Sequence, residues 1–319
     1  MPTTEKQRYT NKLNELAKRY GKLEDQTARE IQAMLQETRR QIIASLSDAS
    51  TTQAGQFALE QLKGNIERQI AEFEARANST LNTSLATAFD VGGLYSVEPL
   101  QALGFQNVFL NPSRAQLNVL QGLSSDLITG ITADMRKVVN QQVRQAALGQ
   151  ISPFEAMKNV TAGFGGASPK VEQGKLVTKG ISAKAEMDIR TEMQSVFNLS
   201  NHSQQMETAK QIPGLLKRWI ATADGRTRRG HLEIHRETAR KPIPSAEPYN
   251  VRNWRFTKSR GWQLTGETAK LDYPAQLGKP GWAVINCRCS EATIHPEIGV
   301  IGSSLDGRIG ATLARSEER

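Results

Sequence analysis

Cysteine is almost absent from this chain of 319 residues, and its only two cysteines, Cys287 and Cys289, are separated by a single arginine. A disulfide across a Cys-x-Cys pair has poor geometry, so a scaffold held together by disulfides is excluded. Three interpretations of the pair remain: half of a metal site, a reactive thiol pair, or a tight structural turn.

Long apolar stretches are also missing. No run of 18 apolar residues occurs, which excludes a transmembrane helix. The N-terminal "MPTTEKQRYTNKLNEL" is polar, so we expect no secretory signal and synthesis in a reducing cytoplasm. Aromatic residues make up 6% of the chain and apolar residues 38%. This composition favours long exposed helices over one large core.

The aromatic and charged residues are distributed unevenly along the chain. All four tryptophans, both cysteines and three of the four histidines follow residue 210. Residues 1–210 carry 23 Lys+Arg against 21 Asp+Glu, whereas residues 211–319 carry 18 against 11. The net charge of +9 and the pI near 9.6 favour a polyanionic partner or an acidic protein surface.

Apolar spacing predicts helices through the first 210 residues. Five residues recur at spacings of 4, 3, 4 and 3, and they predict a helix of about 40 residues: Tyr9, Leu13, Leu16, Tyr20 and Leu23. This apolar stripe packs either on the chain's own helices or on another protein. Further helices are expected over 59–73, 81–89, 126–149, from 152 onward and over 185–211, with a loop at 90–104.

The pattern changes after residue 211. "KRWIATAD" predicts a strand, "RTRRGHLEIHRETAR" a short helix and "WAVINCRCSEATIH" a strand-like run, whereas the proline-rich stretch 241–282 indicates loops. We therefore predict an α+β protein, with an extended, mainly α-helical N-terminal region and a small mixed α+β C-terminal domain. The expected parts are a long amphipathic helix over 1–50, a helical region over 51–210, the small domain over 211–296 and a flexible tail over 297–319.

One group of polar residues fits enzymatic chemistry. Asp224, Arg228 and His231 could serve as orienter, anion clamp and general base in a nuclease-like or transferase-like site. Structural ion-pair networks imitate such sites often, and the chain has no Gly-rich phosphate loop and no nucleophile elbow. We therefore expect no catalytic residues and no enzymatic activity.

A second group fits a metal site. His231, Cys287 and Cys289 supply three suitable ligands, and His235 or His295 is a candidate for the fourth. Cys-x-Cys is not a standard zinc spacing, and free cysteine is commonly buried. We therefore favour buried structural thiols and expect no cofactor and little or no bound metal, with zinc as the alternative.

A basic stretch with interleaved aromatic residues fits contact with DNA. Residues 217–260 carry 12 Lys+Arg against 4 Asp+Glu. Such a surface binds phosphates without reading sequence, although it equally fits a solvated face with tryptophans in a small core. The candidate DNA-binding residues are Arg252, Arg255, Lys258, Arg260, Trp254 and Trp262.

Several segments, in this order, resemble the phage Mu F-like head-morphogenesis family of tailed bacteriophages. They are "KRWIATADGRTRRGHLEIH", a proline-rich spacer and "VINCRCSEA", preceded by helical segments that include "DIRTEMQSVFNLSN". The resemblance covers roughly residues 125–295. Matched by position, the motif of the domain core falls on Trp219, Asp224, Arg228, His231, Asn286, Cys287, Arg288 and Cys289.

The resemblance implies a minor head protein that is made in the host cytoplasm and lies inside the capsid near the portal vertex. It implies a non-enzymatic role in head assembly, DNA packaging or DNA delivery. The implied partners are the portal protein, contacted through 51–210, the scaffold and major capsid proteins, and packaged double-stranded DNA, with no membrane and oligomers only at the portal. In the domain, Arg288 is expected to pair with Asp224 while the thiols lie inside. The alternatives are a nuclease-like or transferase-like, toxin-like enzyme and a sequence-independent DNA-binding module.

Overall fold

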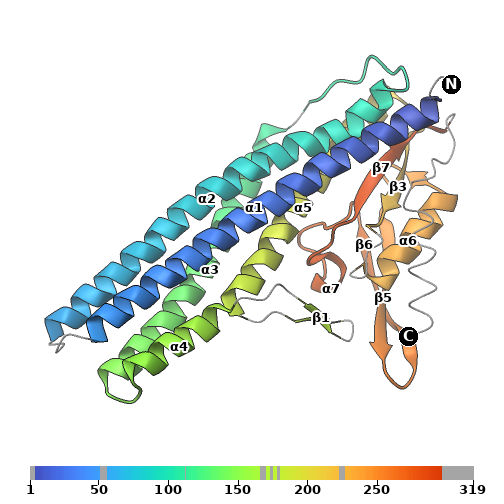
Figure 1. Cartoon of the computed structure of the whole chain (residues 1–319). Coiled ribbons are helices and arrows are strands. Elements are labelled where there is room, and N and C mark those ends of the chain that lie inside the picture. Colours follow the sequence, from blue (N-terminus) through green and yellow to red (C-terminus); the bar gives the residue numbers. More distant parts are fainter. Residues whose placement is uncertain are drawn as a thin grey trace.

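Long helices form an elongated body from the first two thirds of the protein (Figure 1). The computed structural model describes residues 4–50, 56–111, 113–165, 170–172, 175–177, 180–222 and 227–296, so the expected tail over 297–319 lies outside the described residues. The body contains α1 (Glu5–Ser50), α2 (Gln56–Gln101), α3 (Arg114–Ala147), α4 (Pro153–Phe164) and α5 (Gly180–Gln211). A short antiparallel pair, β1 (Lys170–Glu172) and β2 (Lys175–Val177), precedes α5.

A small mixed domain follows the body, which confirms the predicted α+β fold. Its central sheet has the antiparallel order β4-β3-β7, from β4 (Ile243–Pro244), β3 (Leu216–Ile220) and β7 (Ser290–Ile294). The remaining elements are α6 (Arg229–Arg240), the hairpin of β5 (Tyr249–Thr257) and β6 (Gly261–Leu271), and the short α7 (Gly281–Val284).

The apolar stripe of α1 packs within the chain. Tyr9, Leu16, Ile31 and Leu35 are buried in one core that also contains residues of α2, α3 and α5. The N-terminal end of α1 also reaches the small domain, where the Tyr9 hydroxyl donates to the Thr293 carbonyl of β7. Of the two interpretations of this stripe, the structure therefore shows the one in which it packs on its own neighbours.

The loop predicted at 90–104 was wrong for most of its length, because α2 continues to Gln101 and joins the two shorter helices expected before it. Gly92 and Gly93 in "DVGG" suggested a break, yet both lie inside the helix. A Cβ atom added at Gly92 would lie 2.2 Å from the Phe197 carbonyl oxygen of α5. The glycine is therefore required for close approach of the two helices and not for a turn.

The loop predicted over 241–282 was also wrong in its centre, where β5 and β6 form a long antiparallel hairpin. Buried and polar residues alternate along both segments, as in strands with one buried face. The residues that face the small core are Tyr249, Val251, Ala269 and Leu271. In the expected strand-like run around the cysteines, only the part after them is a strand. The part before them, Gly281–Val284, is a helical turn.

The close contact of α2 with α5 gives a stability prediction. Gly92→Ala should destabilise the protein by about 1–3 kcal/mol, because the added methyl group overlaps the Phe197 carbonyl. Gly64→Ala is the matched control in the same helix, since nothing lies within 4 Å of its added Cβ. It should stabilise the protein by about 0.5–1 kcal/mol through helix propensity. Chemical denaturation measures both, and equal effects of the two substitutions would contradict the close packing.

Candidate functional site

One imidazole and two thiols meet in the core of the small domain. His231 projects from α6, and Cys287 and Cys289 come from the segment that leads into β7. The Nδ1 atom of His231 lies 3.6 Å from the Cys287 sulfur and 3.5 Å from the Cys289 sulfur. All three residues are 2% exposed, and the His231 ring packs edge-on against Trp219. The three ligand atoms lie within 4.8 Å of one another, so the group could hold a metal ion.

A bend in the backbone brings the two sulfurs to this point. After α7, Asn286 adopts a left-handed conformation with φ of 53°, which asparagine tolerates better than most residues. Its backbone amide donates to the Thr191 hydroxyl of α5 at 2.7 Å, and the Cys287 amide donates to the Val284 carbonyl at 3.1 Å. The Cys289 amide then points at the Cys287 sulfur, 3.5 Å away.

The two thiols differ in their electrostatic surroundings. Burial alone would raise the pKa of Cys287, but its hydrogen bond with Cys289 and the nearby His231 and Arg228 lower that pKa well below its usual value. Burial and the adjacent Cys287 raise the pKa of Cys289. Burial lowers the pKa of Arg228, while the two thiols act in the opposite direction. The cluster therefore favours a negative charge on Cys287 next to a guanidinium.

Most of the residues predicted for the domain core do come together. Trp219 is fully buried beside His231, and the Arg228 guanidinium donates to the Ile285 carbonyl just before Asn286. Asp224 lies outside the described residues, so its expected pairing with Arg288 and its place in an enzymatic cluster are not described.

Neither histidine considered as a fourth ligand belongs to the cluster. The Nδ1 atom of His235 accepts from the Ala221 amide at 3.2 Å, and its Nε2 lies 3.3 Å from the Arg218 guanidinium. The His295 ring packs against Phe105, with the ring centroids 4.8 Å apart.

A row of side-chain amides on α5 holds the strand that follows the cysteines. Gln194 and Asn198 both donate to the Cys289 carbonyl at 2.9 Å. Asn201 donates to the Glu291 carbonyl at 2.8 Å, and Gln205 donates to the Thr293 hydroxyl at 3.0 Å. Since β7 lies at the edge of the three-stranded sheet, the amides of Gln194, Asn198 and Asn201 take the place of a further strand.

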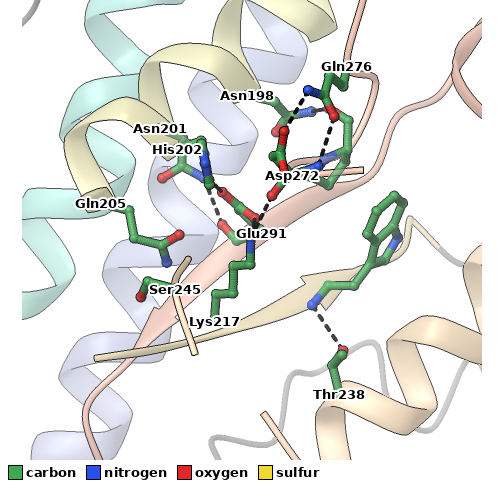
Figure 2. Close-up of polar contacts among 12 residues, drawn as sticks. Asn198, Asn201, His202, Gln205, Lys217, Thr238, Ser245, Asp272, Gln276 and Glu291 are labelled. Carbon is green, nitrogen blue, oxygen red and sulfur yellow. Dashed lines mark hydrogen bonds and ion pairs between the residues drawn. The ribbon is translucent and has the colours of Figure 1, made fainter. Parts of the chain in front are cut away.

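Figure 2 shows a buried ionic group at this junction. Glu291 of β7 lies between His202 of α5, whose Nδ1 is 2.9 Å from a carboxylate oxygen, and Lys217 of β3, whose Nζ is 3.9 Å from the other. The side chains of Lys217 and Glu291 are fully buried. Lys217 also donates to the Asp272 carbonyl at 2.5 Å, and burial lowers its pKa despite the neighbouring carboxylate.

Sequence reasoning missed this row and the ionic group. The signal was present in "QSVFNLSNHSQQ", where amide side chains recur at spacings of 4, 3 and 4 along one helix face: Gln194, Asn198, Asn201 and Gln205. Polar residues at helical spacing usually indicate a solvated face, so nothing in the sequence alone marked this one as buried.

The candidate DNA-binding residues divide into two sets on the β5–β6 hairpin. Arg252 forms ion pairs with Glu233 and Glu237 of α6, and the Trp254 indole donates to Glu233 at 2.7 Å. The Arg229 guanidinium lies over the Trp254 ring. Trp254 therefore fixes the hairpin to α6, and the charge of Arg252 is already balanced.

The second set lies at the hairpin tip. Arg255, Lys258 and Arg260 are exposed there, beside the edge-to-face pair of Phe256 and Trp262, whose centroids are 5.4 Å apart. Between residues 255 and 264 the chain carries no acidic residue. In Figure 1 this tip projects away from the helical body.

A cavity of about 270 Å³ lies where α1 covers the sheet. Its walls include Tyr9, Tyr20 and Glu24 of α1 together with Arg218 and Arg288. Arg288 thus faces α1, where it interacts electrostatically with Glu24, and the thiols on either side of it face the domain core.

Comparison of the chain with protein-family models, with curated proteins and with solved structures found no match. Within the described ranges, no helix has the length and apolar character needed to cross a membrane.

The buried ionic group gives a second stability prediction. Glu291→Gln leaves the Lys217 ammonium buried without its counter-charge and should cost about 3–5 kcal/mol of unfolding free energy at neutral pH. The folded-state pKa of Lys217 then falls further below the unfolded value. The unfolded state therefore binds more protons, and the variant should regain stability as pH rises.

The matched control is Glu207→Gln on α5, which removes an exposed pair with Lys210. It should change the free energy of unfolding by less than about 0.5 kcal/mol. Urea titrations at several pH values measure both variants. A Glu291→Gln variant as stable as the control would show that the buried pair contributes little.

Proposed function

We propose that this protein is a minor head protein of a tailed bacteriophage, a non-enzymatic component held at the portal inside the capsid. It is made in the host cytoplasm and acts in head assembly, DNA packaging or DNA delivery. The observation that carries the proposal is the convergence of the motif residues. Trp219, Arg228, His231 and the segment 286–289 are separated in the sequence but share one small core, as expected if the resemblance reflects a common domain.

The burial of this cluster supports a non-enzymatic role. His231, Cys287 and Cys289 are each 2% exposed. The cavity described above is lined by Arg288 and α1 and not by these three residues. A general base or nucleophile needs contact with its substrate, so the cluster is better suited to holding the domain together than to catalysis.

The portal contact is assigned to the far end of the helical body. Because the stripe of α1 is buried, deleting residues 1–50 would remove part of the core rather than a docking surface. Two large apolar side chains are instead exposed at the turn between α3 and α4: Leu148 at 66% and Phe154 at 74%. The two residues flank the same short connection between helices, and exposed apolar side chains grouped on a surface mark interaction sites.

The portal contact is tested by co-expression with the portal protein encoded in the same genome. We expect the full chain to co-purify with the portal and to be found in purified capsids by mass spectrometry. Leu148→Ser combined with Phe154→Ser should reduce co-purification. The control is Phe109→Ser, since Phe109 is 67% exposed on the loop between α2 and α3 at the other end of the body.

This experiment tests the proposed docking surface and the proposed function separately. Loss of portal binding in both variants, or in neither, would contradict the assignment of the α3–α4 turn. Absence of the unaltered protein from capsids and from portal complexes would contradict the proposed function itself.

The hairpin tip is proposed to contact packaged DNA through phosphates. Changing Arg255, Lys258 and Arg260 together to Ala should weaken binding to DNA of any sequence. It should also make the negative slope of log affinity against log salt shallower by about 3, since each lost contact releases roughly one counterion fewer. Fluorescence anisotropy over a salt series measures both effects.

The control for this prediction is Arg252→Ala. Arg252 lies on the same hairpin but is neutralised by Glu233 and Glu237, so its loss should change the slope much less. Equal slopes for the triple variant and the unaltered protein would remove the tip from the DNA contact.

A further inference from the structure

We propose that His231, Cys287 and Cys289 bind one zinc ion, which fastens α6 to the segment that leads into β7. One imidazole nitrogen and two sulfurs are a ligand set typical of zinc. The sequence favoured metal-free thiols because of the Cys-x-Cys spacing. The geometry supports the alternative, and it does so independently of the proposed role in the phage head.

The distances between the ligand atoms match tetrahedral zinc. Bonds of about 2.3 Å to sulfur and about 2.05 Å to nitrogen, at the tetrahedral angle, place the two ligand atoms about 3.6 Å apart. The observed separations from His231 Nδ1 are 3.6 Å to the Cys287 sulfur and 3.5 Å to the Cys289 sulfur. Both nitrogen–sulfur separations therefore match those around a zinc ion, and all three ligand atoms lie within 4.8 Å of one another.

Hydrogen bonding alone accounts for only half of this arrangement. The Nδ1 atom of a neutral imidazole has either one lone pair or one hydrogen, so it makes one good hydrogen bond and not two. Both sulfurs nevertheless lie at nearly the same distance from that nitrogen. A metal ion at their centre satisfies all three atoms at once.

The backbone around the cysteines also suits bound thiolates. A thiol sulfur is a weak hydrogen-bond acceptor, yet the Cys289 amide points at the Cys287 sulfur at 3.5 Å. Asn286 holds a left-handed conformation just before the first cysteine, fixed by Thr191. Such conformations persist where the surrounding structure requires them, and here the bend delivers both sulfurs to one point.

The charges around the cluster indicate which kind of fourth ligand a bound zinc ion would take. A zinc ion with two thiolates and a neutral imidazole has no net charge, and Arg228 adds a guanidinium that interacts with both sulfurs. An anionic fourth ligand, such as hydroxide, would make the buried group neutral. His235 and His295 make their contacts elsewhere. Because both thiols lose their protons on binding, zinc affinity should fall as pH falls.

The experiment measures metal in the full chain, purified without chelator from medium supplemented with zinc. Inductively coupled plasma mass spectrometry should find about one zinc per chain, and removal of the metal should lower the melting temperature. Protein stripped of zinc and reloaded with Co²⁺ should show a thiolate-to-cobalt charge-transfer band and visible bands of tetrahedral intensity. This spectrum reports thiolate ligation in the unaltered protein, without recourse to any variant.

Three single substitutions, His231→Gln, Cys287→Ser and Cys289→Ser, should each abolish stoichiometric zinc. The matched control is His235→Gln on the same helix, which removes an equally buried imidazole that does not face the sulfurs. It should lower stability and keep the metal. Folded, unaltered protein that takes up neither zinc nor cobalt would overturn the proposal, as would zinc retained in Cys287→Ser or Cys289→Ser.

Discussion

The packing of the small domain on the helical body depends on one edge of the short strand β7. β7 pairs with β3 on one side only, so its other edge would carry unpaired backbone groups inside the structure. The side-chain amides of Gln194, Asn198 and Asn201 on α5 pair this edge by donating hydrogen bonds to the Cys289 and Glu291 carbonyls. A helix thereby replaces a strand, and the small domain and the helical body become parts of one packed structure.

The same contacts determine the geometry of the His–Cys–Cys cluster. The Cys289 carbonyl receives two hydrogen bonds from α5, and the amide of Asn286 is bound by Thr191 of the same helix. The segment with both sulfurs is therefore positioned from the body, whereas His231 is positioned by α6. The cluster therefore lies buried between the cysteine segment, which α5 holds, and α6. A shift of either element would separate the ligand atoms.

Much of the fold follows from the sequence where one physical signal dominates. The long stripe of α1 and the helix α5 were predicted from apolar spacing. A helix was also expected from residue 152 onward, and there the Glu155 amide donates to the Ser152 hydroxyl that caps α4. Prediction failed where one residue type is compatible with two different local structures. Gly92 indicated a break but serves a helix contact, and prolines near the hairpin concealed its alternation.

The candidate site was only partly predictable for a related reason. The motif residues were identified by resemblance, but their role depends on whether they are buried. The type of a polar residue does not predict whether it is buried. Arg252 and Arg255 are three positions apart on one strand; one is paired with α6 and the other is exposed.

The β5–β6 hairpin packs closely against α6. In α6, a Cβ atom at Gly230 would lie 2.1 Å from the Arg252 carbonyl oxygen, so the hairpin rests directly on the helix that carries His231. The hairpin, α6 and the His–Cys–Cys cluster are therefore packed as one small domain, and the amides of α5 join that domain to the helical body.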